Sequence, residues 1–345
     1  MPRRFPSPSA RVLSLAWLLF AAVGCSKGSE PAPEAKAAPQ PETAAPAAKP
    51  AEAQVVKIGY QKIGAPFLLK ERAADLEKQL AAKNARLEWV EFQAGPPIYE
   101  AMRAGAVDIG YSGETPPVFA QAGGVPFVYV ATDAPAPASE AILVPKSSKI
   151  TKVAELKGKH IALNRGSNVH YLLVRALEEA GLTLDDVQVT YLAPPDARSA
   201  FEGGKLDAWV IWDPFQAAAE QGGARILRDG KGIVDNRFYY VARRDFATSS
   251  PELLRLVMAE FERLTAWAGS RPEEVAQILA RSSGVAYEAL LTSEKRHVYK
   301  IEPITPEILD KQQKIADTFS KLQLIPKTLQ LRDAFLASVA YGSGS

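Results

Sequence analysis

The hydrophobic pattern of the chain changes near residue 55 and again near residue 245. Between these points, short apolar runs typical of strands alternate with stretches of helical period. Val55–Tyr60 and Leu87–Phe92 are typical of strands, and Phe67–Leu80 between them is typical of a helix. This alternation predicts mostly parallel sheets with crossover helices, which is an α/β fold.

The last hundred residues have a helical pattern almost throughout. Thr305, Pro306 and Glu307 form a typical helix start, with a cap, a proline in the first turn and an acidic residue. We expect C-terminal helices at Pro251–Trp267, Pro272–Ala280, Ala286–Tyr299 and Pro306–Leu322.

One local pattern occurs twice, about one hundred residues apart. Ala101–Asp108 leads into an apolar strand and then into Ser112–Pro117, and Phe201–Asp207 leads into Ala208–Trp212 and then into Asp213–Phe215. In both copies a helix stops at glycine, an aspartate begins a strand, and an acid followed by proline starts the next helix. We interpret the connectors themselves as structural, and the repetition as a sign of two lobes of similar build.

The predicted lobes divide the chain into 55–144 for lobe 1, 145–238 for lobe 2 and 239–345 for a return to lobe 1 with the C-terminal helices. Two extended crossings, near Glu140–Lys146 and Phe238–Arg244, are the expected hinge. Open α/β sheets bind ligands at the carboxyl ends of their strands. Two facing lobes would therefore place both repeated loops in one cleft.

The first 54 residues do not have the pattern of a folded domain. Three arginines precede the apolar run Val12–Gly24, which is too short to span a membrane and is typical of a secretory signal. Small residues before Cys25 resemble a bacterial lipobox, and Cys25 is the only cysteine in the chain. We expect residues 1–24 to be a lipoprotein signal peptide, Cys25 to be lipidated, and the Pro/Ala-rich segment 25–54 to be a tether.

Composition and charge exclude some classes of function. The chain has 345 residues, with 41 Lys and Arg against 39 Asp and Glu. This balance leaves no excess of positive charge for a phosphate backbone, so nucleic-acid binding is not expected. The three histidines, His160, His170 and His297, have no metal-type spacing and no nucleophile motif beside them. We expect no metal, no cofactor and no catalytic residues.

From about Val55 to Pro326 the chain resembles the aliphatic sulfonate-binding proteins of ABC transporters, within the taurine, nitrate and sulfonate solute-binding group. The segments that carry this resemblance are Ile58–Lys62, Glu140–Lys146, Gly166–Val174, Asp207–Glu220 and Gln312–Phe319. The resemblance implies a two-lobed, type II periplasmic binding protein fold with hinged lobes. It also implies an extracytoplasmic protein that captures an alkanesulfonate and delivers it to an ABC permease and its ATPase. We expect a monomer in the periplasm or at the cell surface, held to the membrane through Cys25.

A sulfonate is a monoanion with acceptor oxygens, so neutral donors and helix starts can hold it. Ser167 or Asn168 is expected to cap the helix that begins there, leaving N–H groups toward the cleft. Glu114 and Asp213 are acidic and are more suited to bracing their loops. His170 is interpreted as packed or loop-orienting, and either Trp209 or Trp212 as core. The predicted ligand-binding set is Gln61, Ser112, Gly113, Glu114, Ser167, Asn168, Val169, His170, Trp212, Asp213 and Tyr239.

Other functions stay open at this stage. The ligand could be taurine, nitrate or another small organic anion. A cofactor-biosynthesis enzyme built on a binding-protein fold is a second hypothesis, although the signal segment and Cys25 argue against a cytoplasmic enzyme. A binding module that feeds a sensor is a third.

Overall fold

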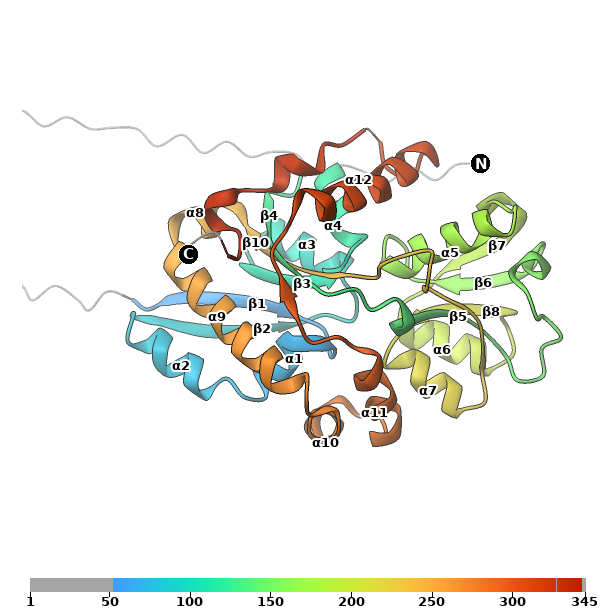
Figure 1. Ribbon diagram of the computed structural model, residues 1–345, viewed down its shortest axis with the longest axis horizontal. Coiled ribbons are helices and arrows are strands. Elements are labelled where there is room, and N and C mark those ends of the chain that lie inside the picture. Colours follow the sequence, from blue (N-terminus) through green and yellow to red (C-terminus); the bar gives the residue numbers. More distant parts are fainter. Residues whose placement is uncertain (1–51, 327, 343–345) are drawn as a thin grey trace, which may run out of the picture. The chain divides into compact units, whose positions relative to one another are not determined.

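The computed structural model describes residues 52–326 and 328–342. The predicted signal peptide 1–24, Cys25 and nearly all of the tether 25–54 lie outside these residues. In the described part, strands and helices alternate and a group of C-terminal helices follows (Figure 1). The strands are β1 (Gln54–Tyr60), β2 (Ala85–Glu91), β3 (Ile109–Gly113), β4 (Phe127–Asp133), β5 (Glu140–Val144), β6 (His160–Leu163), β7 (Gln188–Tyr191), β8 (Ala208–Trp212), β9 (Arg225–Asp229), β10 (Phe238–Arg243) and β11 (Ile301–Glu302).

Helices connect the strands of each sheet and form most of the C-terminal part. They are α1 (Gly64–Lys70), α2 (Ala74–Ala81), α3 (Pro96–Arg103), α4 (Pro116–Ala122), α5 (Asn168–Glu179), α6 (Pro194–Glu202), α7 (Phe215–Gln221), α8 (Arg244–Ser249), α9 (Pro251–Ala268), α10 (Pro272–Ser283), α11 (Tyr287–Arg296) and α12 (Pro306–Lys321). Short 3-10 helices are η1 (Pro137–Ser139), η2 (Val153–Leu156), η3 (Leu184–Asp186), η4 (Leu331–Ala334) and η5 (Ala337–Val339). Among residues 52–326 and 328–342, no helix is long and apolar enough to cross a bilayer.

The two sheets have the same internal order. The first is β11-β4-β10-β3-β1-β2 and the second is β7-β6-β8-β5-β9. In each sheet three strands are parallel, and the next strand is antiparallel to its neighbours on both sides. That antiparallel strand is β10 in the first sheet and β5 in the second. Each is the first strand after the chain crosses from one sheet to the other, so the two lobes are topologically equivalent.

This topology corrects the predicted lobe boundary. The predicted end of lobe 1 is residue 144, whereas Glu140–Val144 pairs with β8 and β9 in the second sheet. The first crossing therefore lies at residues 134–139, and the second lies before Phe238, where β10 begins in the first sheet. An apolar run predicts a strand but does not say which sheet it joins, which is why the boundary was displaced.

The repeated connector has the same structural role in both lobes. Asp108 accepts a hydrogen bond from the backbone N–H of Lys57 at 2.9 Å, and Asp207 accepts one from the backbone N–H of His160, also at 2.9 Å. Each aspartate thus ties the start of one parallel strand to its neighbour. The preceding glycines, Gly105 and Gly204, have φ values of 72° and 69°, which suit glycine at the end of a helix.

The C-terminal helices pack on both lobes. The helix α9 lies against α1 and α2, and α10 lies against α1 and α11 (Figure 1). The helix α11 also contacts α7 of the second lobe, and α12 lies against α4. On α12, Phe319 packs against His170 of α5, so this helix also contacts both lobes.

Candidate ligand-binding site

A small cavity lies where loops of the two lobes meet. Its walls come from the carboxyl ends of β1, β2, β3 and β8, from the start of α5 and from the first residue of β10. None of the lining side chains carries a charge. The lining residues are Gln61, Ile63, Gly95, Gly113, Pro116, Ser167, Asn168, Trp212 and Phe238.

Two glycines allow the loops around the cavity to approach closely. A Cβ atom on Gly113 would lie 2.7 Å from Oδ1 of Asn168, and one on Gly95 would lie 2.8 Å from Cγ of Pro116. Cβ atoms do not approach other heavy atoms this closely, so larger residues would displace the opposing loop. Gly113 belongs to the first lobe and Asn168 to the second. Their contact therefore depends on glycine at position 113.

The start of α5 is not capped by a side chain. Ser167 occupies the N-cap position, but its hydroxyl donates to the carbonyl oxygen of Asn164 at 2.6 Å and accepts nothing from the helix. The expectation that Ser167 or Asn168 caps this helix is therefore wrong. The first N–H groups of a helix have no acceptor within the helix. Here the backbone N–H of His170 donates to the carbonyl oxygen of Ser167 at 3.0 Å, whereas Asn168, at the positive end of the helix dipole, lines the cavity.

The side chain of Asn168 is engaged within the protein. Its Nδ2 donates to Oε2 of Glu140 at 2.6 Å and to Oδ1 of Asn236 at 2.8 Å. These two bonds use both amide hydrogens. Asn168 can therefore offer a ligand its backbone N–H, but not its side-chain donors.

Val169 and His170 are on α5 but point away from the cavity, into the second lobe. Val169 is fully buried in the core. Nδ1 of His170 accepts a hydrogen bond from the backbone N–H of Gly166 at 3.3 Å, and the ring packs against Phe319. Burial and, to a lesser degree, the charge of Arg165 lower the pKa of His170 to about 4, so the ring is neutral. His170 orients the loop before α5.

Ser112, Glu114 and Tyr239 also lie outside the cavity. The Ser112 hydroxyl shares a hydrogen bond with the Tyr99 hydroxyl at 2.9 Å inside the first lobe. Glu114 and Tyr239 instead line a wide groove beside α5 and α12. Oε2 of Glu114 accepts a hydrogen bond from the backbone N–H of Arg237 at 3.1 Å. Burial, aided by the charge of Asp235, raises the pKa of Glu114 to about 7.

Asp213 braces the turn after β8. Its Oδ1 accepts a hydrogen bond from the backbone N–H of Ala217 at 3.0 Å and lies 3.3 Å from a guanidinium nitrogen of Arg296. Burial raises the pKa of Asp213 to about 6, although Arg296 acts in the opposite direction. Arg296 is the last residue of α11, and it also pairs with Glu220 at 2.6 Å. These ion pairs join the C-terminal helices to the second lobe.

Trp212 lines three adjoining spaces, whereas Trp209 is core and packs against Phe201. One neighbour of the small cavity is a larger pocket that shares Gln61, Ile63 and Trp212 with it. About half of the remaining wall of this pocket is apolar, and Lys62 and Glu91 form an ion pair there. The other lining residues are Lys62, Glu91, Phe92, Gln93, Pro195, Pro214, Phe215, Ser283 and Val285.

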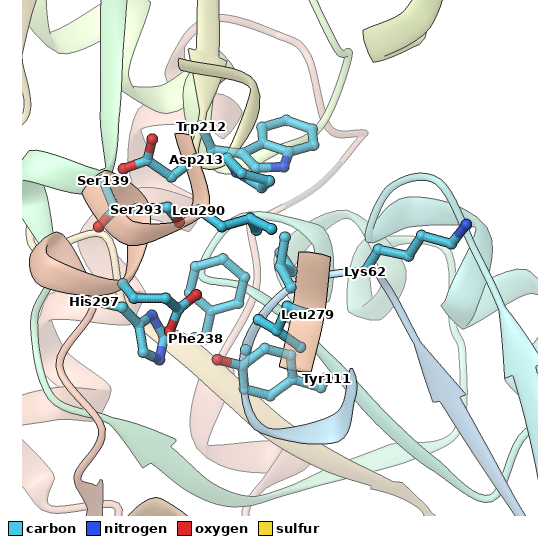
Figure 2. Close-up of a pocket in the computed structure, with 14 residues that line it drawn as sticks. Lys62, Tyr111, Ser139, Trp212, Asp213, Phe238, Leu279, Leu290, Ser293 and His297 are labelled. Carbon is cyan, nitrogen blue, oxygen red and sulfur yellow. The ribbon is translucent and has the colours of Figure 1, made fainter. Parts of the chain in front are cut away.

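The other neighbour is a small chamber that shares Ile63, Trp212 and Phe238 with the small cavity. Figure 2 shows Trp212 and Asp213 on one side of this chamber, Tyr111 and His297 on the other, and the Lys62 side chain extending away. Burial lowers the pKa of His297 to about 4. Within the described residues, no group of three His, Cys, Asp or Glu side chains could hold a metal ion.

Several lining residues were missed by the sequence analysis, namely Ile63, Gly95, Pro116 and Phe238. Gly95 and Pro116 could have been found because both follow strands and stand next to a proline at a helix start. Ile63 and Phe238 are ordinary apolar residues in the sequence. Nothing local distinguishes them from core residues.

Two equivalent lobes with an uncharged, donor-lined cavity between them define a two-lobed solute-binding protein. A family model described as "NMT1/THI5 like" matches residues 88–275, more than half of the chain, and the protein belongs to this family. The predicted two-lobed periplasmic binding protein fold is thereby confirmed.

The relatives include proteins named for sulfonate binding. The chain is 40% identical over 281 residues to a protein of Escherichia coli (strain K12) described as binding aliphatic sulfonates, which covers 81% of this chain and 88% of the relative. It is similar to the alkanesulfonate-binding protein of Xanthomonas axonopodis pv. citri bound to MOPS, with 34% identity and a TM-score of 0.78 over 83% of this chain and 99% of that one. The periplasmic aliphatic sulphonate-binding protein of Escherichia coli gives 38% identity and a TM-score of 0.74 over 82% and 92%.

The same fold also occurs in an enzyme. A desulfurization enzyme shares it with a TM-score of 0.58 and 17% identity over 82% of this chain and 96% of that one. At this identity only the fold is shared. The fold by itself therefore does not separate receptors from enzymes, and the chemistry of the site must do so.

Proposed function

We propose that this protein is the extracytoplasmic solute-binding component of an ABC importer, capturing aliphatic sulfonates between its lobes and delivering them unchanged to the permease and its ATPase. The observation that carries this proposal is the uncharged cavity at the uncapped start of α5. A monoanion fits such a site because N–H groups and the helix dipole can balance one negative charge.

The donors around the cavity suit a sulfonate group. Asn168, at the start of α5, and Gln61 both line the cavity, so a backbone N–H group and a side-chain amide can donate there. Nε2 of Gln61 makes only a long hydrogen bond, 3.4 Å, to the carbonyl oxygen of Tyr111, so it can turn to a ligand at little cost. Neutral donors avoid the cost of desolvating a buried cation, which favours reversible capture.

The apolar pocket next to the cavity suits the tail of the ligand. Because Gln61, Ile63 and Trp212 belong to both walls, a head group in the cavity would direct its substituent toward Phe92 and Phe215. Each buried methylene contributes about 0.8 kcal/mol. The pocket therefore favours alkyl chains of several carbons over taurine and nitrate.

The relatives support this choice of ligand. The Escherichia coli relative is described as binding aliphatic sulfonates, and the Xanthomonas protein was solved with MOPS, itself a sulfonate. The enzymatic alternative receives no support from the cavity. Its walls contain no acid, base or thiol, and His170 and Asp213 are both engaged in bracing loops.

Calorimetry and thermal unfolding of the purified protein test this function. We expect methanesulfonate, butanesulfonate and hexanesulfonate to bind with increasing affinity, and MOPS to bind as well. At a ligand concentration of 100 times Kd, the free energy of unfolding should rise by about 2.7 kcal/mol. Taurine and nitrate serve as comparison anions, and the ligand should be recovered chemically unchanged.

Two results would contradict the proposed function. One is the absence of any shift in unfolding temperature with millimolar sulfonates. The other is conversion of a sulfonate to a product by the purified protein, which would favour an enzyme.

We further propose that Cys25 carries a lipid that anchors a monomer to the membrane, with the body in the periplasm or at the cell surface. The support is the apolar run before Cys25 and the Pro/Ala-rich segment after it. Cys25→Ser should prevent acylation and move the protein from the detergent phase to the aqueous phase on Triton X-114 partitioning. If the variant still enters the detergent phase in full, the assignment of Cys25 as the lipid anchor is wrong.

A further inference from the structure

Two buried carboxyl groups lie beside the crossings between the lobes, close to the cavity but outside its wall. Glu140 is the first residue of β5 and has no exposed surface. Its Oε2 accepts from Asn168, and its Oε1 has no partner. No positively charged side chain pairs with Glu140 among the residues that the structure describes.

Glu114 is the second of these groups and comes from the other lobe. It is 3% exposed, and its Oε1 likewise has no partner. Its Oε2 is held by the backbone N–H of Arg237, while the guanidinium of Arg237 bonds the Asp133 carbonyl at 2.9 Å and Glu302 at 2.8 Å. The guanidinium of Arg237 is thus bonded to other acceptors, and its charge lowers the pKa of Glu114 less than burial raises it.

The remaining titratable groups that face Glu114 do not neutralise it. The phenols of Tyr171 on α5 and Tyr239 on β10 are neutral, because burial and the charge of Glu114 raise the pKa of both. Asp235 on the second crossing adds a further negative charge, and Lys311 on α12 is paired with Asp235 at 3.0 Å.

Other charges of the groove balance one another in part. On α5, Arg175 and Glu178 form an ion pair. The cations of α12 line the outer groove, where water screens them.

Buried carboxyl groups that are not paired with a cation favour the protonated form, and two whose charges interact do not both ionise readily. Burial, followed by the charge of Glu114, raises the pKa of Glu140 well above its ordinary value. Since the pKa of Glu114 is raised to about 7, the pair holds one proton firmly and a second one loosely near neutral pH.

The pair is directly linked to the cavity. Asn168 bonds Glu140 through its side chain and forms the cavity wall through its backbone. Gly113, on the opposite wall, is the residue before Glu114. An anion in the cavity would therefore bring a further negative charge next to the two carboxyl groups.

We propose that capture of the anion takes up a proton from solvent at the Glu114–Glu140 pair, so that ligand and proton enter the protein together. This inference rests on the proposed function. The ligand contributes one negative charge, the carboxyl pair binds one proton, and the net charge of the closed protein does not change. The only covalent bond formed is the O–H bond of the carboxyl group that takes up the proton.

The pH dependence of affinity follows from the sign of this linkage. A bound anion raises the pKa of Glu114 further above its value in the empty site. Proton uptake then occurs between about pH 7 and the higher pKa of the complex, and affinity falls as pH rises through this range. With one proton involved, the fall is at most about tenfold per pH unit.

Calorimetry with hexanesulfonate at pH 8, in phosphate and in Tris, tests the proposal. A sulfonate stays ionised throughout this range, so the difference in heat between the two buffers reports protons taken up by the protein. We expect an uptake of roughly half to one proton per ligand. Affinity should be several-fold higher at pH 6.5 than at pH 8.5.

Substitutions locate the proton. Glu114→Gln should reduce the uptake strongly, because it removes the carboxyl group that takes up the second proton. Glu140→Gln should keep the uptake, because the amide replaces a carboxyl group that is already protonated. Glu260→Gln is the matched control, since Glu260 is equally buried but is paired with Arg263 on α9. This control should keep the uptake of the wild type.

Three results would overturn the inference. If the heat of binding is the same in both buffers, the protein takes up no proton. This result would contradict the inference but not sulfonate binding. Uptake that persists in Glu114→Gln would move the proton to another group. Absence of any binding heat would contradict the proposed function as well as this inference. If Glu114→Gln fails to fold, the comparison of the two buffers with the wild type decides.

Discussion

At the scale of single residues, the direction of each side chain decides whether it reaches the cavity. Of the predicted site residues, Gln61, Gly113, Ser167, Asn168 and Trp212 line it. Ser112 and Glu114 flank Gly113, and Tyr239 follows Phe238, but successive residues of an extended chain point to opposite sides. The sequence predicts which strand end faces the cleft. It does not predict which of two neighbours points inward.

The N-terminus of α5 shows a second limit at this scale. Ser167 is typical of a capping residue, yet its hydroxyl bonds Asn164. The Ser167 hydroxyl can form a hydrogen bond either by accepting from the start of the helix or by donating to Asn164. The choice depends on the loop held by His170, which is a tertiary contact.

Gly113 provides a test of the contact between the lobes. In Gly113→Ala the new Cβ would lie 2.7 Å from Oδ1 of Asn168, so the loops must separate and the start of α5 must move. We expect hexanesulfonate affinity to fall by about tenfold or more, equivalent to about 1.4 kcal/mol, when measured by calorimetry. The control is Gly123→Ala, where the contact at 3.2 Å is with the flexible end of Arg103. Equal affinity in both variants would contradict this close approach.

At the scale of elements, the period of the apolar residues and the residue types at helix starts predict where some strands and helices begin. The predicted strand Val55–Tyr60 is β1, and the predicted start of the last helix is confirmed, because the Thr305 hydroxyl accepts from the backbone N–H of Ile308 at 3.3 Å. The predicted helix Phe67–Leu80 is divided into α1 and α2. No glycine or proline separates them, so the sequence carries no signal for the break.

The helix α11 allows a pH-dependent prediction for Glu294. Burial is the main reason that its pKa is raised to about 7, and its Oε2 accepts from the Tyr299 hydroxyl at 2.7 Å. A carboxyl group whose pKa is raised by folding stabilises the protein at low pH, and this contribution is lost as pH rises through the raised pKa. Glu294→Gln should therefore gain stability relative to the wild type between pH 4.5 and pH 8.

The expected gain is about 1–3 kcal/mol in the free energy of unfolding, measured by urea denaturation at both pH values. The comparison between pH values cancels any constant effect of the new amide group. A difference between variant and wild type that is the same at pH 4.5 and pH 8 would show that Glu294 is not protonated on folding.

At the scale of the whole molecule, the repeated connector led to the right architecture. Asp108 and Asp207 occupy equivalent places in two sheets of the same strand order. The lobe boundary was not predictable, because β5 is as apolar as any strand of the first sheet and only its pairing shows that it belongs to the second. Local pattern specifies elements, whereas the assignment of a strand to a sheet depends on contacts far apart in sequence.

The central claim is that an alkanesulfonate lies between the lobes and is held by neutral donors. A crystal structure of the protein with hexanesulfonate tests it most directly. We predict sulfonate oxygens within hydrogen-bonding distance of the first N–H groups of α5 and of Gln61, with the alkyl chain against Trp212 in the adjoining apolar pocket. A sulfonate bound through an arginine or lysine elsewhere, with the cavity at Gly113 and Ser167 left empty, would contradict the account.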